Sequence, residues 1–165
     1  MILYHGTTLE IRQPGIIRRE IGRDFGFAFY TTDIQEQAER WALRRAKIES
    51  RLRHSDCSGV VNEYEWDEDL SGLSYKKYEK ADLEWLEMVM RCRSDIHYSH
   101  GFDIVEGKIA NDNVGETVSF VMQGIMRKED AVNRLRFERI NNQIAFCSDR
   151  ALDHLHFVKS YAVEE

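Results

Sequence analysis

Two stretches decide the fold, Leu3-Tyr4-His5-Gly6-Thr7-Thr8 and Asp24-Phe25-Gly26-Phe27-Ala28-Phe29-Tyr30-Thr31-Thr32. The first begins in an apolar strand, predicted over residues 1–5, that delivers a histidine followed by a glycine. His5 offers a side-chain hydrogen bond, and a planar group can approach the backbone of Gly6 closely because glycine has no Cβ. The second stretch supplies an aromatic face, with a strand predicted over residues 27–31.

A long helix is expected directly after the second stretch. Thr32-Asp33-Ile34-Gln35 has the spacing of a capping box, which predicts a helix that begins there and ends near residue 52. The apolar residues at helical spacing are expected to form its buried stripe: Ile34, Ala38, Trp41, Ala42 and Ile48. Its many basic residues indicate a solvated face with helical ion pairs, or a surface that meets phosphates: Arg40, Arg44, Arg45, Lys47, Arg51 and Arg53.

The rest of the chain mixes strands and helices without a repeat or a linker. Strands are predicted over residues 59–66, 102–109, 143–147 and 155–162, and helices over 83–90, 114–125 and 128–140, with a helical turn at 149–153. Gly124 is the expected stop between two of the helices. This mixture indicates one α+β domain that covers residues 1–165.

Composition excludes several classes of protein. A chain of 165 residues, 42% hydrophobic and 32% charged, is typical of an ordinary globular domain. Neither a signal sequence nor an apolar run of bilayer length is present, and three widely spaced cysteines fit free thiols, so we expect a cytoplasmic protein without a membrane partner. The net charge of -6 argues against a broad electrostatic grip on nucleic acid.

Histidines and cysteines do not indicate a metal site. The candidates do not have the spacing of a four-ligand zinc set, so no metal is expected: Cys57, Cys92, His97, His100, His154 and His156.

The motifs resemble the ADP-ribosyltransferase superfamily in its His-Tyr-Glu class, the class of diphtheria toxin and the poly(ADP-ribose) polymerases. The closer resemblance is to a bacterial family known as a domain of unknown function, with the pattern LYHGT, DFG.GFYTT, WL..V...R, DIV.G..A.D and Q(I/V).F. Matching residues lie at 3–7, 24–32, 85–93, 103–112 and 143–146, so the resemblance covers nearly the whole chain. The chain departs from the pattern at Ala28, where a glycine is expected, and at Glu106, which interrupts an apolar run.

The resemblance implies a split antiparallel β-sheet core with flanking helices, and NAD as the substrate. In this class His5 would hydrogen-bond the adenosine ribose, the Gly6 backbone would pair with the nicotinamide carboxamide, and Tyr30 would stack on the nicotinamide ring. The implied cofactor-binding set is His5, Gly6, Thr7, Phe25, Gly26, Phe27, Tyr30 and Thr31, in which the phenylalanines are walls of the pocket, while Phe29 is expected in the core. An arginine between the two stretches would meet the pyrophosphate: Arg12, Arg18, Arg19 or Arg23.

The third catalytic position is the main departure from the class. After His5 and Tyr30 the class normally has a glutamate that bonds the nicotinamide ribose, and the matching residue here is Gln143. An amide can orient the same hydroxyl but cannot act as a general base. This favours transfer of a single ADP-ribose unit, slow NAD hydrolysis or an acceptor that needs no deprotonation over chain formation. Glu116 and Glu138 are outside candidates for the missing carboxylate.

Each of these residues also has a purely structural interpretation. His5 could be a satisfied histidine at a strand end, Tyr30 a core aromatic, and Gln143 a partner of neighbouring backbone.

Two functions are therefore open. The first is an NAD-dependent mono-ADP-ribosyltransferase that modifies a protein or nucleic-acid acceptor and releases nicotinamide, a role that fits the toxin of a toxin–antitoxin pair with an antitoxin partner. The second is a catalytically degenerate domain of the same fold that binds NAD or a protein partner.

Overall fold

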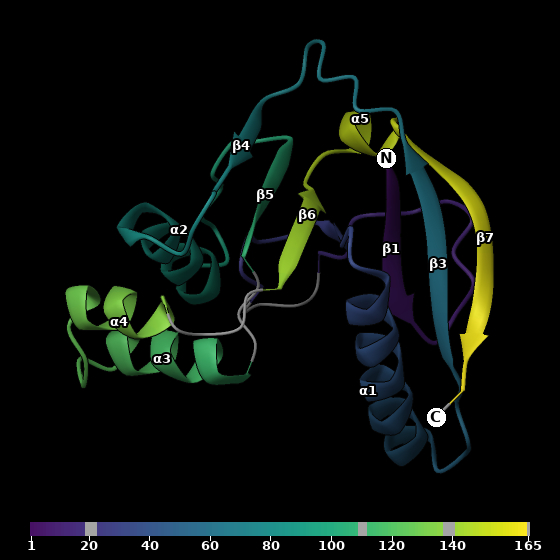
Figure 1. Ribbon diagram of the computed structural model, residues 1–165, viewed down its shortest axis with the longest axis horizontal. Coiled ribbons are helices and arrows are strands. Elements are labelled where there is room, and N and C mark those ends of the chain that lie inside the picture. The colour runs from purple at the N-terminus through teal and green to yellow at the C-terminus, as the bar shows by residue number, and fades with distance from the viewer. Residues whose placement is uncertain (19–22, 109–111, 137–140, 165) are drawn as a thin grey trace.

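The protein has a mixed α+β fold in which two β-sheets stand side by side (Figure 1). The computed structural model describes residues 1–18, 23–108, 112–136 and 141–164. Across these residues it has five helices, one of which runs along the first sheet while three gather beyond the second. The expected α+β class is confirmed.

The first sheet has the strand order β1-β3-β7 and is antiparallel throughout. Its strands are β1 (Ile2–Thr7), β3 (Gly59–Trp66) and β7 (Leu155–Val163), close to the predicted ranges. The helix α1 (Gln35–Arg53) packs along it in Figure 1. Glycines allow this close packing, because a Cβ on Gly6 would lie 2.1 Å from the carbonyl oxygen of Ala38, and one on Gly59 would lie 2.9 Å from the carbonyl carbon of Ala42.

The second sheet has the strand order β2-β6-β5-β4. Its strands are β2 (Phe29–Thr31), β6 (Asn142–Phe146), β5 (Ile104–Lys108) and β4 (Tyr75–Lys77). The pair β4–β5 is parallel, so this sheet departs from the purely antiparallel core that was expected. The sequence pattern also did not predict β4, which is only three residues long.

The remaining helices complete the two sides of the molecule. The helices α2 (Leu83–Ser94), α3 (Asp112–Met122) and α4 (Lys128–Leu135) form a cluster beyond the second sheet in Figure 1, and the short α5 (Asp149–Leu152) leads into β7. All four lie close to their predicted positions. The predicted ends at 109 and 137–140 fall outside the described residues.

Within the described residues, one isolated backbone bridge joins the two sheets, between Tyr4 of β1 and Thr32 just after β2. The N–H of Tyr4 donates to the Thr32 carbonyl at 2.8 Å, and the N–H of Thr32 donates to the Tyr4 carbonyl at 2.9 Å. Beyond this bridge the strands separate. An apolar cluster that includes Leu3, Tyr64 and Phe146 fills the space between the sheets on one side of the bridge.

Two predictions for α1 are wrong. The helix begins at Gln35 with Ile34 as its N-cap residue, so the predicted capping box does not form; the Thr32 hydroxyl instead accepts from the N–H of Ile34 at 3.1 Å. The large apolar residues of the expected stripe are also exposed, by 37% for Ile34, 40% for Trp41 and 39% for Ile48. The buried residues are three alanines, Ala38, Ala42 and Ala46, because only small side chains fit between the helix and the glycine-bearing strands, and Gln37, which bonds the backbone of Asn142 instead.

Along the described ranges, no helix combines the length and the apolar character that crossing a bilayer requires.

Candidate functional site

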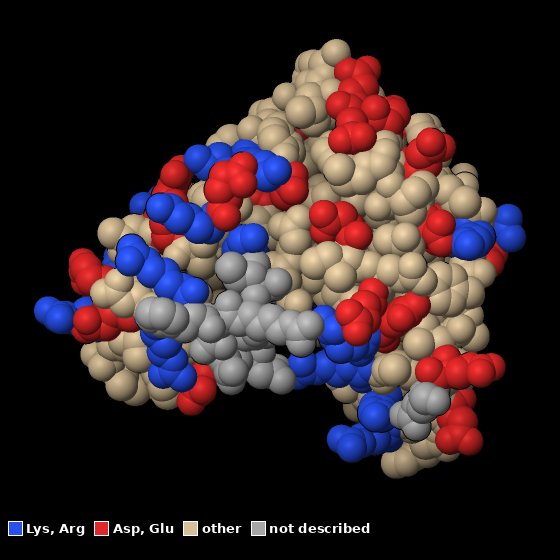
Figure 2. All heavy atoms as spheres, in the orientation of Figure 1, with Lys and Arg blue, Asp and Glu red and all other residues tan. Residues whose placement is uncertain are grey.

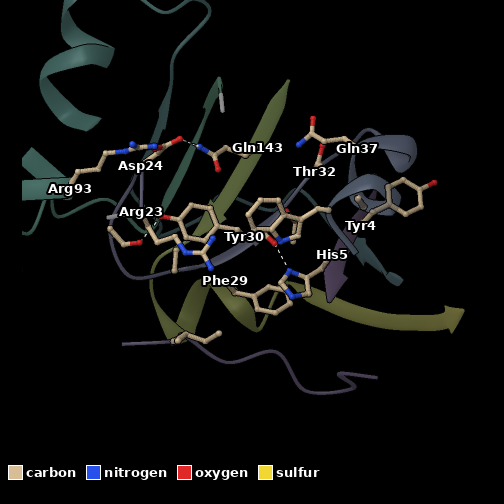
Figure 3. Close-up of a pocket in the computed structure, with 17 residues that line it drawn as sticks. Tyr4, His5, Arg23, Asp24, Phe29, Tyr30, Thr32, Gln37, Arg93 and Gln143 are labelled. Atoms are coloured by element: carbon tan, nitrogen blue, oxygen red, sulfur yellow. Dashed lines mark hydrogen bonds and ion pairs between the residues drawn. The ribbon is translucent and has the colours of Figure 1, made fainter. Parts of the chain in front are cut away.

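A cavity of about 250 Å³ opens where the two sheets separate. It is lined from β1, from the segment that leads into and through β2, from the first half of α1, and by single residues of α2 and β6. Figure 3 shows this arrangement, in which His5 and Gln143 lie on opposite sides of Tyr30. The lining residues are Tyr4, His5, Gly6, Ile17, Arg23, Asp24, Gly26, Ala28, Phe29, Tyr30, Thr31, Thr32, Gln37, Ala38, Trp41, Arg93 and Gln143.

His5 is held as a neutral hydrogen-bond acceptor. Its Nδ1 lies 2.6 Å from the carbonyl oxygen of Tyr30, and its ring stacks on Phe29 with the centroids 4.4 Å apart. Burial lowers the pKa of His5 to about 4, and the charges of Arg23 and Arg45 add to this effect. Since a carbonyl can only accept, Nδ1 carries the proton of the neutral ring and Nε2 is left as an acceptor.

Gly6 turns its peptide groups towards the gap between the sheets. Along an antiparallel strand the N–H and C=O of alternate residues point to the same edge. Those of Tyr4 both bond Thr32, so the groups of Gly6, two residues further along β1, point to the edge that faces β2. The space where a Cβ would stand is filled by α1, so helix packing alone already requires a glycine at this position.

Tyr30 presents part of its ring to the cavity while its hydroxyl is fixed. The hydroxyl donates to the carbonyl of Gly26 at 2.5 Å and accepts from the N–H of Phe25 at 3.1 Å. Burial, aided by the charge of Asp24, raises its pKa well above the usual range. Tyr30 therefore offers a π face and not an acid or a base.

An arginine and a tryptophan continue this aromatic surface to the rim. The guanidinium of Arg23 lies 5.5 Å from the centre of the Tyr30 ring and 6.0 Å from that of Trp41. Of the four arginines predicted to meet a pyrophosphate, Arg23 lines the cavity. Arg12 lies over Phe157 and Arg18 is exposed, and neither is a lining residue, while Arg19 is outside the described residues.

Gln143 is buried, only 5% exposed, at the inner end of the cavity. Its Nε2 lies 3.4 Å from Oδ2 of Asp24 and 3.3 Å from the carbonyl oxygen of Lys108. Asp24 is 6% exposed, and its Oδ1 accepts from Nε and Nη2 of Arg93 at 2.8 and 2.5 Å. Gln143 is thus backed by a buried ion pair.

Gln37 ties α1 to the start of β6, next to Gln143. Its Nε2 donates to the carbonyl of Asn142 at 2.8 Å, and its Oε1 accepts from the N–H of the same residue at 3.2 Å. This pair of bonds fixes the backbone of the residue that precedes Gln143.

Most of the predicted site residues meet in this cavity, and three do not. His5, Gly6, Gly26, Tyr30 and Gln143 all line it, as does Thr31, whose hydroxyl donates to the carbonyl of Ile144 at 2.8 Å. Thr7, Phe25 and Phe27 are not lining residues. Phe25 is fully buried beside Tyr78, because the turn at Gly26, with φ +77°, directs it into the core. Phe29 is buried as expected and also lines the cavity.

Sequence reasoning missed the ion pair behind Gln143. Asp24 and Arg93 belong to two of the quoted motifs, so the signal was present, but their pairing joins residues far apart in the chain. Of the two outside candidates for a carboxylate, Glu116 does not line the cavity and lies 3.7 Å from Arg134 on the helical side, and Glu138 lies outside the described residues.

The basic side of α1 carries both signs of charge. Ion pairs join Arg45 and Arg53 to Glu49 at 3.0 and 2.9 Å, and Arg40 to Glu36 at 3.7 Å. In Figure 2 the blue side chains that gather where α1 lies have red ones beside them. These pairs agree with the interpretation as a solvated helix face.

Across the described segments, no three His, Cys, Asp or Glu side chains gather in a way that could hold a metal ion.

The fold and the cavity thus define a mixed α+β protein with a pocket at the junction of two sheets. Residues 1–157 match the family described as "Protein of unknown function (DUF3990)", and the chain belongs to this family. Searches of curated proteins and of solved structures gave no match.

Proposed function

We propose that this protein is an NAD-dependent mono-ADP-ribosyltransferase, with the cavity as its active site. The observation that carries the proposal is the meeting around one pocket of residues from three strands: His5 and Gly6 of β1, Tyr30 of β2 and Gln143 of β6. These are the positions that the sequence resemblance assigns to NAD. The fold is compatible with a split-sheet transferase, since the cavity lies where the two sheets part.

Each wall of the cavity carries groups that suit a different part of the dinucleotide. Nε2 of neutral His5 can accept from a ribose hydroxyl, and the peptide edge of Gly6 offers one donor and one acceptor to a carboxamide. Tyr30 offers its ring to the nicotinamide, and Arg23 on the rim offers a charge to the pyrophosphate.

In the proposed reaction the bond between ribose C1′ and the nicotinamide nitrogen breaks, and neutral nicotinamide leaves with the electron pair. The acceptor atom then bonds to C1′ and loses its proton to solvent or to a base of the acceptor. The transition state has oxocarbenium character, as in glycoside hydrolysis, so orientation and electrostatics are the protein's main contributions. Gln143 would orient the ribose 2′-hydroxyl.

The test is to incubate the pure protein with NAD and to follow free nicotinamide and ADP-ribose. Removing one preorganised group of this kind costs about 10² to 10³ in rate, so Gln143→Ala is expected to slow nicotinamide release by that factor. Tyr30→Ala should weaken both binding and turnover.

Tyr98→Ala is the matched control, because Tyr98 is a partly buried tyrosine that packs on the α2 side and does not line the cavity. NAD binding without nicotinamide release would replace the transferase proposal with a binding module. No NAD binding at all would remove the transferase proposal and the NAD-binding alternative, and would leave a domain of this fold that binds a protein partner.

A further inference from the structure

We propose that Asp24 is the positioning residue of this site. It holds Gln143 with its carbonyl oxygen towards the cavity, and it supplies, through the amide, the negative charge that position 143 itself lacks. The inference rests on the proposed function of the cavity, but its geometric part can be tested without any turnover.

The orientation of the Gln143 amide follows from its surroundings. Two acceptors, Oδ2 of Asp24 and the Lys108 carbonyl, lie 3.4 and 3.3 Å from the same end of the amide. Only an NH₂ group can satisfy both, so a reversed amide would place its oxygen against a carboxylate and a carbonyl. Figure 3 shows the Gln143 oxygen pointing away from Asp24 and towards Tyr30.

The Gln143 oxygen is available to a ligand. No donor to Oε1 is found within the described part of the chain. A fully buried oxygen would then be left without a hydrogen bond, and Oε1 is not such an atom, so it is accessible. It can therefore accept from a hydroxyl in the cavity.

Asp24 is fixed more firmly than Gln143. Arg93 binds it through two guanidinium nitrogens, and the Asp24 side chain is only 7% exposed. A charge held in a poorly hydrated place polarises the groups bonded to it more strongly than one in water. The negative end of the Gln143 amide, its oxygen, then faces the place where a cationic ribose would form.

The Gln143 amide and the Asp24 carboxylate together thus act like a single carboxylate, except that the negative charge lies on Asp24, behind the amide, and not at position 143. Gln143→Glu should not improve the site, because it places a second carboxylate beside Asp24. Moving the charge without adding one should cost less than either single change, since the amide that Asp24→Asn introduces would donate its NH₂ to a carboxylate at position 143; the contact of that carboxylate with the Lys108 carbonyl remains.

The experiment compares Asp24→Asn, Gln143→Glu and the double variant Asp24→Asn/Gln143→Glu. Each single change is expected to lower kcat for nicotinamide release by about 10- to 100-fold with a smaller change in KM, since hydrogen bonds to charged groups are worth about that much. The double variant, which has the same net charge as the native chain, should recover part of the loss. A folded double variant that is no faster than the slower single variant overturns the proposal.

A spectroscopic measurement on the NAD-free protein separates this inference from the function. In the native protein the side-chain NH₂ resonances of Gln143, assigned by their loss in Gln143→Glu, should be shifted from those of exposed glutamines and exchange slowly with solvent. Asp24→Asn/Arg93→Met, which removes both charges of the buried pair, should move them towards the exposed values.

If the native protein releases no nicotinamide, the transferase proposal fails and the NMR result alone decides the placement of Gln143. Resonances that are unchanged in Asp24→Asn/Arg93→Met overturn the role of Asp24 whether or not the protein turns over NAD.

Discussion

The His5 wall of the cavity and the Gln143 wall hold their functional groups by different means. His5 is placed by close packing, with Phe29 on its ring, a backbone carbonyl on Nδ1, and α1 pressed against the adjacent Gly6. Gln143 is placed by charge, through the buried pair of Asp24 and Arg93. The first wall should therefore respond mainly to changes of volume, and the second mainly to changes of charge.

The largest effect is expected for Gly6→Ala. The new Cβ would stand 2.1 Å from the carbonyl oxygen of Ala38 and 2.9 Å from the backbone nitrogen of Ala42. Neither atom can move away unless the helix shifts, so we expect a loss of about 3 kcal/mol or more in the free energy of unfolding, measured by urea denaturation. Gly15→Ala is the control, because nothing lies within 4 Å of its added Cβ. Equal stability of the two variants would show that α1 does not press on β1.

Local patterns were sufficient to predict most elements of the fold but not how α1 packs. The stripe of Ile34, Trp41 and Ile48 has the correct helical period, yet all three are exposed because the glycine-bearing strands admit only small side chains. The strand β4 was missed because three residues, Tyr75–Lys77, are too few for any alternation to be visible.

For the site, the motifs identified the residues that line the cavity better than the residues that support them. His5, Gly6, Tyr30 and Gln143 meet as expected. Phe25 was misplaced because a single turn at Gly26 reverses which aromatic faces the core, and such a turn depends on tertiary contacts. The pairing of Asp24 with a residue of another motif is a long-range property that no local pattern contains.

A smaller effect is expected when the charge of the second wall is left unbalanced. Arg93→Met keeps much of the side-chain volume but leaves the buried Asp24 carboxylate without its guanidinium. Breaking a fully buried pair costs about 3–5 kcal/mol, and because the Arg93 side chain is 22% exposed, water screens the remaining charge and we expect about 2 kcal/mol. Thermal or urea unfolding measures it.

The double change Asp24→Asn/Arg93→Met removes both charges and should recover most of the lost stability. If Arg93→Met alone is as stable as the native protein, the pair does not hold this wall.

The smallest effect concerns the pH response of the first wall. The pKa of His5 is about 4 in the folded protein, below its ordinary value of 6.5, so the unfolded chain binds a proton more readily between these pH values. The contribution of the neutral His5 ring to the free energy of unfolding is therefore fully present above about pH 6.5 and is lost as the pH falls towards 4. His5→Asn keeps an N–H donor for the Tyr30 carbonyl and removes the titration. Between pH 7 and 4.5 the native protein should lose about 1–2 kcal/mol more unfolding free energy than this variant, measured by urea denaturation at each pH. If the unfolding free energies of the two proteins change equally with pH, His5 accepts a proton without disturbing the first wall. The packing around His5 then does not favour the neutral ring.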